Sequence, residues 1–129
     1  MKYLLDTNTC ISLLKNVNGI RAKIIAVGMD ECCVSEITIA ELYYGAAKSG
    51  RTQHYDDVRF IQDHFEILPI QPALDLFGRN KYALEAKGMR IDDFDLLIAS
   101  TAIFNNLTVV THNTKHFNRI QNLQVEDWE

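Results

Sequence analysis

The chain lacks the features that mark fibrous, disordered and membrane-spanning proteins. It has 129 residues, only two prolines, and a hydrophobic content of 47%. That composition argues against a disordered chain. No apolar run reaches about 18 residues, which excludes a transmembrane helix. A chain of this length can bury one core, so we predict a single domain over residues 1–129.

Cysteine is scarce, and basic charge is not in excess. The three cysteines, Cys10, Cys32 and Cys33, are odd in number and include an adjacent pair, which is a poor disulfide framework. We therefore expect buried free thiols in a reducing, cytoplasmic protein. The N-terminus has one lysine and then reaches Asp6, which is too short and too acidic for a signal peptide. The net charge of −4 is unusual for a nucleic-acid-binding protein unless a metal reverses the local sign of clustered acids.

The chain has no Walker loop, no dinucleotide-binding glycine fingerprint and no serine nucleophile elbow. It does have six acidic or amide residues, nearly all placed where a segment begins or ends: Asp6, Glu41, Asp92, Asp93, Asp95 and Asn113. Carboxylates brought together repel one another unless a cation binds them. Oxygen ligands favour magnesium or manganese over zinc. These residues therefore predict a divalent metal site and phosphate-ester chemistry.

Short apolar segments alternate with amphipathic ones along the chain. We predict strands at residues 2–5, 31–34, 67–70, 107–110 and 123–125, and helices at 7–15, 20–27, 35–47, 53–65, 72–87, from 92 or 93 to 104, and at 114–117. This alternation predicts an α/β fold with a mainly parallel sheet of four to five strands and helices on both faces. Pro69 places the third strand at a sheet edge. Because parallel strands share one carboxyl edge, Asp6 and Asn113 should face the same end of the sheet.

Two of the acids each have two open interpretations. Asp6 is either the N-cap of the helix that follows or a metal ligand, and Thr7 or Asn8 could also cap that helix. Glu41 is either a solvated surface residue, like most helical glutamates, or a residue that points into a cleft. Its apolar neighbours favour the cleft.

The acidic group at residues 92–95 precedes a very apolar helix. Asp92 or Asp93 fits an N-cap, and negative charge is favourable at a helix N-terminus. Capping does not require Asp95, which lies within the first turn. We therefore interpret Asp92 and Asp93 as cap residues in the first place, although they could also assist metal binding.

Taken together, several segments resemble the PIN-domain ribonucleases, and more closely their VapC toxins of toxin–antitoxin pairs. The resemblance extends over essentially the whole chain, and it rests on the order and spacing of the motifs rather than on any one of them. The matching segments are Leu4–Asn8, Ser35–Leu42 with Gly45, Phe94–Ala99, Val110–Thr114 with Phe117, and Val125–Trp128.

The resemblance implies a PIN-like three-layer sandwich and an endoribonuclease that depends on Mg²⁺ or Mn²⁺. It also implies that a metal-activated water hydrolyses phosphodiester bonds of structured RNA, either a transfer RNA or a ribosomal RNA. The matching positions are Asp6, Glu41 and Asp95 as catalytic and metal-binding acids, Asn113 as a weaker ligand, and Thr7, Asn8 and Thr111 as residues that hold the ligands.

The resemblance further implies partners. These are an antitoxin whose C-terminal segment enters the active-site groove, a second copy of the toxin, and promoter DNA bound only through the antitoxin, with no membrane. The candidate RNA-binding cations are Lys48, Arg51, Lys87, Arg90 and Lys115. Their alternative interpretation is solvated surface charge.

A different functional class remains open at this point, a non-catalytic receiver-like regulatory module with a metal-binding acidic pocket. Such a module needs two acids after the first strand, but Asp6 is followed by Thr7 and Asn8. A phosphoaspartyl phosphatase needs a second aspartate two residues after the first, where Asn8 stands.

Overall fold

The computed structural model describes all 129 residues and contains one five-stranded sheet. The strands are β1 (Tyr3–Leu5), β2 (Cys32–Ser35), β3 (Glu66–Leu68), β4 (Thr108–Val110) and β5 (Gln124–Glu126). Their order is β3-β2-β1-β4-β5, and every pairing is parallel. The predicted α/β class and parallel sheet are confirmed, and β3 lies at the edge, directly before Pro69.

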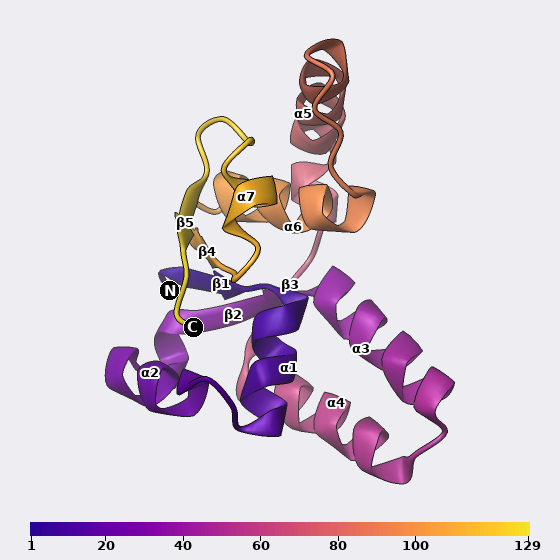
Figure 1. Cartoon of the computed structure of the whole chain (residues 1–129), viewed down its shortest axis with the longest axis vertical. Coiled ribbons are helices and arrows are strands. Elements are labelled where there is room, and N and C mark those ends of the chain that lie inside the picture. Colours follow the sequence, from indigo (N-terminus) through magenta and orange to yellow (C-terminus); the bar gives the residue numbers. More distant parts are fainter.

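Seven helices cover the two faces of the sheet. They are α1 (Thr7–Lys15), α2 (Ile20–Val27), α3 (Glu36–Ser49), α4 (Thr52–His64), α5 (Leu74–Ala86), α6 (Asp93–Phe104) and α7 (Thr114–Phe117). Figure 1 shows α1 to α4 on one side of the sheet and α5 to α7 on the other. This arrangement is the predicted three-layer sandwich. No helix has both the length and the apolar character that a membrane crossing requires.

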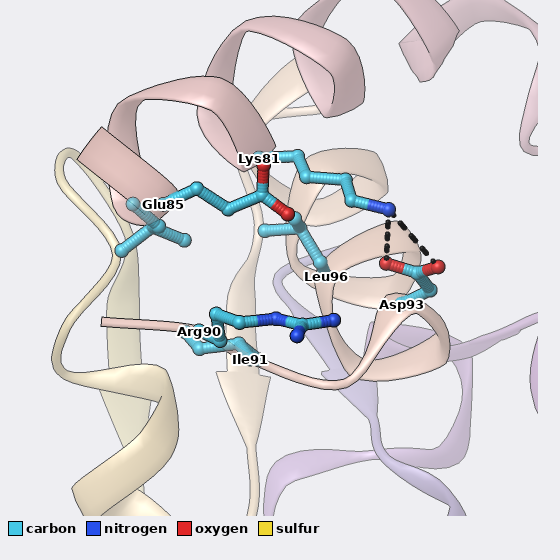
Figure 2. Close-up of a pocket in the computed structure, with 7 residues that line it drawn as sticks. Lys81, Glu85, Arg90, Ile91, Asp93 and Leu96 are labelled. Carbon is cyan, nitrogen blue, oxygen red and sulfur yellow. Dashed lines mark hydrogen bonds and ion pairs between the residues drawn. The ribbon is translucent and has the colours of Figure 1, made fainter. Parts of the chain in front are cut away.

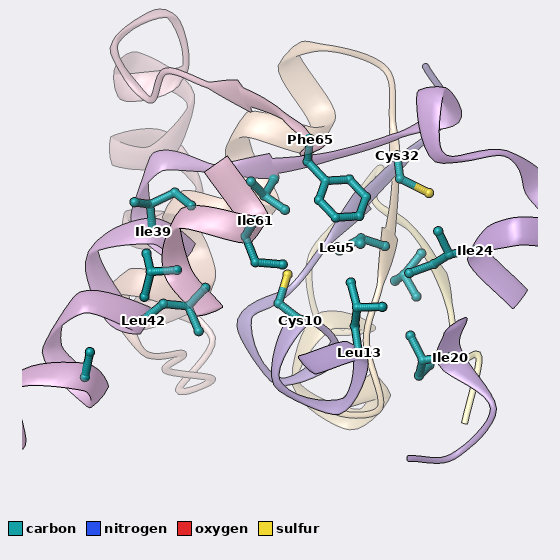
Figure 3. Packing of buried hydrophobic residues seen from close by; sticks show 14 residues of the cluster. Leu5, Cys10, Leu13, Ile20, Ile24, Cys32, Ile39, Leu42, Ile61 and Phe65 are labelled. Atoms are coloured by element: carbon teal, nitrogen blue, oxygen red, sulfur yellow. The ribbon is translucent and has the colours of Figure 1, made fainter. Parts of the chain in front are cut away.

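The central strands divide the core between two layers by simple alternation of side chains. On one face, residues from β1, β2 and β4 pack with α1 to α4 (Figure 3), and on the other face their neighbours pack with α5 to α7. The first set includes Leu5, Val34 and Val110, and the second Leu4, Cys33 and Val109. Because both faces are buried, these strands are continuously apolar in sequence.

The three cysteines are free and buried, as expected. Burial raises the pKa of Cys32 to about 11 and that of Cys33 to about 12, and it raises the pKa of Cys10 still further. All three thiols are therefore protonated at neutral pH and pack as small apolar side chains.

Two elements begin later than predicted, because a short 3₁₀ turn precedes each of them. The helix predicted from Pro72 begins at Leu74, because Pro72 lies in the 3₁₀ turn Gln71–Ala73. The strand predicted from Glu31 begins at Cys32, since Glu31 ends the 3₁₀ turn Met29–Glu31. Such tight turns commonly begin helices and connect elements, and hydrophobic periodicity does not distinguish them from either neighbour.

The strand order reverses between β1 and β4. The chain adds β2 and β3 on one side of β1, and then β4 and β5 on the other. In open parallel sheets, ligands bind outside the carboxyl ends of the strands at such a reversal. Asp6 follows β1 and Thr111 follows β4, so both lie at this point.

Candidate active site

Asp6 is held at the end of β1 by two hydrogen bonds. Its Oδ1 accepts the backbone N–H of Thr9 at 2.8 Å, and its Oδ2 accepts the hydroxyl of Thr111 at 2.5 Å. Only 5% of the residue is exposed. Burial raises the pKa of Asp6, while the hydrogen bonds from Thr111 and Thr9 oppose that increase. The two hydrogen bonds therefore fix the orientation of the carboxylate, but they do not fully offset the cost of burying its negative charge.

Helix α1 is capped by Asp6, so the predicted caps Thr7 and Asn8 are wrong. Thr7 is the first residue inside the helix, and Asn8 is exposed on its surface. The two interpretations of Asp6 are compatible, because one oxygen caps the helix while the other faces Thr111 across the strand ends.

Glu41 points into the cleft between α1 and α3. The Thr7 hydroxyl donates to Glu41 Oε1 at 2.6 Å, and Thr7 Oγ1 also lies 3.1 Å from the hydroxyl oxygen of Thr38. Thr38 lies three residues before Glu41 in α3, so the two side chains share a helix face. Glu41 Oε2 has no hydrogen-bond partner within the protein.

Asp95 lies in the first turn of α6 and makes no side-chain hydrogen bond or ion pair. Burial is the main cause that raises its pKa to about 6. The negative charges of Asp92, Glu41 and Asp6 add to the increase, and the charge of His116 opposes it. Asp95 is therefore near enough to Glu41 and Asp6 for their charges to raise its pKa, although α3, α6 and β1 are far apart in sequence, and these three acids are called the acidic pocket below.

Asp92 and Asp93 each have a structural partner. Asp92 is the N-cap of α6 and accepts the backbone N–H of Phe94 at 3.1 Å. Asp93 forms an ion pair with Lys81, whose Nζ lies 3.1 Å from Asp93 Oδ1 and 3.3 Å from Oδ2 (Figure 2). Capping and ion pairing thus account for both residues, which leaves Asp95 as the uncommitted acid of the group.

We expect Asp92→Ala to lower the free energy of unfolding by about 1 kcal/mol, the usual effect of removing a helix cap. Asp92→Asn keeps a cap oxygen and should unfold like the wild type. Both variants should bind Mn²⁺ with affinity close to that of the wild type. Urea titration and calorimetry measure the two quantities, and a loss of Mn²⁺ binding in Asp92→Asn would instead make Asp92 a ligand.

Asn113 is joined to the same site through Thr111. The Asn113 backbone N–H donates to the Thr111 hydroxyl oxygen at 2.9 Å, and Asn113 Nδ2 donates to His116 Nδ1 at 2.9 Å. The amide oxygen of Asn113 is left without a partner, so it can act as a neutral ligand. The contact between His116 and Asn113 was not foreseen from the sequence, although a spacing of three residues at the start of a short helix was a usable signal.

The donor set fits a hard divalent cation. Glu41 Oε2, both oxygens of Asp95 and the Asn113 amide oxygen are uncommitted, and all are oxygen atoms. Burial is the main cause of the raised pKa of Asp95, repulsion by the neighbouring acids is the second, and a bound cation would offset both. Magnesium keeps several waters and needs only one or two carboxylates, so the acids need not touch one another.

The C-terminal residues lie beside this site, which the sequence did not reveal. Because β5 is parallel to β1, the chain after Glu126 emerges at the same edge as Asp6. Glu129 Oε1 accepts hydrogen bonds from Ser12 and Asn18 at 2.7 Å each, and the charge of Glu129 contributes to the raised pKa of Asp6. His112, Asp127 and Glu129 form the one group of three imidazole and carboxylate ligand atoms within 4.8 Å, and all three residues are exposed.

The five candidate RNA-binding cations are all exposed but lie in different places. Lys48 lies in the last turn of α3 and Arg51 directly precedes α4, at the tip of a helical hairpin that extends away from the sheet (Figure 1). Lys87 and Arg90 lie between α5 and α6, and Arg90 points toward Asp93 in Figure 2. Lys115 lies in α7, next to His116. Arg90 and Lys115 are therefore on segments that also carry site residues, whereas Lys48 and Arg51 are not near the sheet edge.

A groove of about 250 Å³ opens between α1, α3 and α4 and reaches Glu41. Its apolar lining comes from Ile11, Leu14, Leu42, Ala46 and Val58. Glu41 and Asp57 add negative charge to it, and Lys15 adds positive charge. The groove therefore has a largely apolar lining that includes Glu41, one of the three acids.

Known proteins resemble this chain over its whole length. The PIN domain family matches residues 3–123. Ribonuclease VapC2 of Rickettsia felis is 35% identical and covers 100% of this chain and 99% of its own length. The tRNA(fMet)-specific endonuclease VapC of Salmonella typhimurium is 33% identical, with coverages of 99% and 98%.

Solved structures agree with these sequence relatives. A chain of the Rickettsia felis VapBC2 complex, bound to a DNA fragment from its promoter, superposes with a TM-score of 0.92 at 34% identity and full coverage of both chains. A chain of the DNA-bound Salmonella typhimurium VapBC complex has a TM-score of 0.88 at 33% identity, with coverages of 100% and 99%.

Proposed function

This chain belongs to the PIN-domain family of VapC ribonucleases, and we propose that it is the toxin of a toxin–antitoxin pair that hydrolyses phosphodiester bonds of structured RNA. The observation that carries this proposal is the state of Asp95. Its carboxylate has no hydrogen-bond or ion-pair partner in the protein, and the charges of Glu41 and Asp6 contribute to its raised pKa. The receiver-like alternative is not favoured, because the similar proteins are VapC ribonucleases.

Ribonucleases of this family generally depend on a divalent metal ion, and Mg²⁺ or Mn²⁺ fits the oxygen donors of this site. Asp6, Glu41 and Asp95 would hold the ion, with the amide oxygen of Asn113 as a weaker ligand. When bound, the ion supplies positive charge that lowers the pKa of a coordinated water and stabilises charge on the phosphate oxygens. The protein keeps the acids oriented, since the hydroxyls of Thr111 and Thr7 fix one oxygen each of Asp6 and Glu41.

Transfer RNA is the substrate class with the most support. The Salmonella typhimurium relative carries the name tRNA(fMet)-specific endonuclease at 33% identity over nearly the whole chain. Arg90 and Lys115 are the proposed contacts to the RNA phosphates, because they adjoin the elements that carry Asp95 and Asn113. A ribosomal RNA loop is the second substrate to test.

The cognate antitoxin is the expected protein partner, since both solved relatives are complexes of VapB with VapC. The groove between α1, α3 and α4 is a suitable path for its C-terminal segment, because its lining is largely apolar and includes Glu41. A basic side chain on that segment would meet the acidic pocket and compete with the metal. A toxin homodimer and promoter binding through the antitoxin belong to the same proposal.

Induced expression of the chain without an antitoxin should arrest growth, and mapping of RNA 5′ ends should reveal one defined new end in a transfer RNA. The purified protein should make the same cut with Mg²⁺ or Mn²⁺ and none after chelation by EDTA, because the acids cannot act on phosphate unaided. Asp95→Asn is the control for both experiments. Cleavage that persists in EDTA, or equally in the control, would argue for a contaminating nuclease and against the proposal.

A further inference from the structure

The Thr7 hydroxyl has a second contact, with Thr38, that determines how Glu41 is held. Thr38 is completely buried in α3, and its Oγ1 lies 3.1 Å from Thr7 Oγ1. A hydroxyl has one proton to donate and two lone pairs that accept. Thr7 donates its single proton to Glu41 Oε1 at 2.6 Å. Thr38 must therefore be the donor to Thr7, and the hydrogen bonds run in one direction, from Thr38 through Thr7 to Glu41.

The other side of the site contains an arrangement of the same form. There the Asn113 N–H donates to the Thr111 hydroxyl oxygen at 2.9 Å, and the Thr111 hydroxyl donates to Asp6 Oδ2 at 2.5 Å. We call each of these chains of hydrogen bonds a relay. In both relays one donor binds the oxygen of a threonine hydroxyl, and that hydroxyl then donates its own proton to a carboxylate. The Thr111 relay starts at a backbone amide, which substitution cannot remove. The Thr7 relay starts at a side chain, so it can be tested.

We propose that Thr38 is a positioning residue for the metal site, which acts on Glu41 only through Thr7. Thr38 makes no hydrogen bond to any of the acids, and its hydroxyl orients the Thr7 hydroxyl so that Glu41 keeps Oε2 free for the ion. The proposal rests on the proposed function, because it assigns Glu41 to a divalent metal. Groups that orient ligands commonly change metal affinity by about 10- to 100-fold when they are removed.

Thr38→Val removes the hydroxyl at nearly constant size and should raise the Mn²⁺ concentration for half-maximal cleavage about tenfold, with the KM for RNA at saturating Mn²⁺ unchanged. Calorimetric titration of Mn²⁺ without RNA should show the same weakening. Thr38→Ser restores the donor and should restore the wild-type Mn²⁺ dependence. Thr101→Val is the matched control, because Thr101 is equally buried and helical but its hydroxyl bonds only to Leu97 O in its own helix.

A double-mutant cycle tests whether Thr38 acts through Thr7. Thr7→Val alone should weaken Mn²⁺ binding at least as much as Thr38→Val, and the double variant should be no weaker than Thr7→Val alone. Additive losses, wild-type Mn²⁺ binding by Thr38→Val, or an equal loss in Thr101→Val would each overturn the proposal. If the wild type binds Mn²⁺ but cleaves no RNA, the proposed function fails while the relay can still be measured by Mn²⁺ binding.

Discussion

Asp95→Asn is expected to abolish RNA cleavage and, at the same time, to make the metal-free protein more stable. Removing one anionic ligand from a site that must hold a divalent cation should lower the single-turnover rate by roughly 10³-fold, which corresponds to ~4 kcal/mol. The free energy of unfolding should rise because Asp95 carries a negative charge that no protein group compensates. Burial and the acidic neighbours raise its pKa to about 6. An amide of the same shape removes that repulsion.

The stability gain should depend on pH in a defined direction. Since the folded-state pKa of Asp95 is about 6 and its ordinary value is 3.8, the ionised form is the one that folding disfavours. Well below pH 3.8 the side chain is protonated in both states, so wild type and Asp95→Asn should unfold alike. The difference should grow between pH 4 and 6 and level off above, at about 2 kcal/mol for a half-buried group.

Urea titrations of both proteins in EDTA, from about pH 3 to pH 8, measure this difference. Adding Mn²⁺ should stabilise the wild type by mass action and leave Asp95→Asn nearly unchanged. Asp93→Asn is a suitable comparison, because Asp93 is already neutralised by Lys81 at 3.1 Å. A metal-free Asp95→Asn that is less stable than the wild type at neutral pH would mean that Asp95 has a structural partner.

The layers of the fold were predictable because both faces of the sheet are buried. Strands such as β1 and β4 are therefore short apolar runs, and the helices between them have clear periodicity. Helices α1 and α2 have the predicted bounds, since a polar cap residue and Gly28 mark their ends. The 3₁₀ turns before β2 and α5 were not predictable, because a single tight turn carries no periodic signal.

The acids of the site were predictable, but the groups that hold them were only partly so. Asp6 and Asn113 follow strands, and parallel strands bring such residues to one edge. The contact between Thr7 and Glu41 joins residues 34 apart in sequence, and the contact between Thr111 and Asp6 joins residues 105 apart. Such pairings depend on tertiary packing. The family resemblance indicated Thr7 and Thr111 as supporting residues, but not Thr38, which only the packing of α3 against α1 reveals.

Two substitutions of Asp6 can separate its role as the cap of α1 from its proposed role as a metal ligand. Asp6→Asn and Asp6→Ala should both lower the cleavage rate by roughly 10³-fold or ~4 kcal/mol, because each removes an anionic ligand. Their effects on stability should differ. Asparagine is as good an N-cap as aspartate and carries no charge to bury, and these two effects offset the acceptor that the Thr111 hydroxyl loses, so Asp6→Asn should unfold within about 1 kcal/mol of the wild type.

Asp6→Ala loses the cap and leaves two buried donors, the Thr9 N–H and the Thr111 hydroxyl, without their acceptor. We expect the free energy of unfolding to fall by about 2–4 kcal/mol, since an unpaired buried polar group costs about 1–3 kcal/mol in addition to the lost cap. Single-turnover cleavage and urea unfolding of both variants provide the test. A fully active Asp6→Asn would reduce Asp6 to a helix cap, whereas an inactive Asp6→Asn with wild-type stability would establish that its charge serves the metal and not the fold.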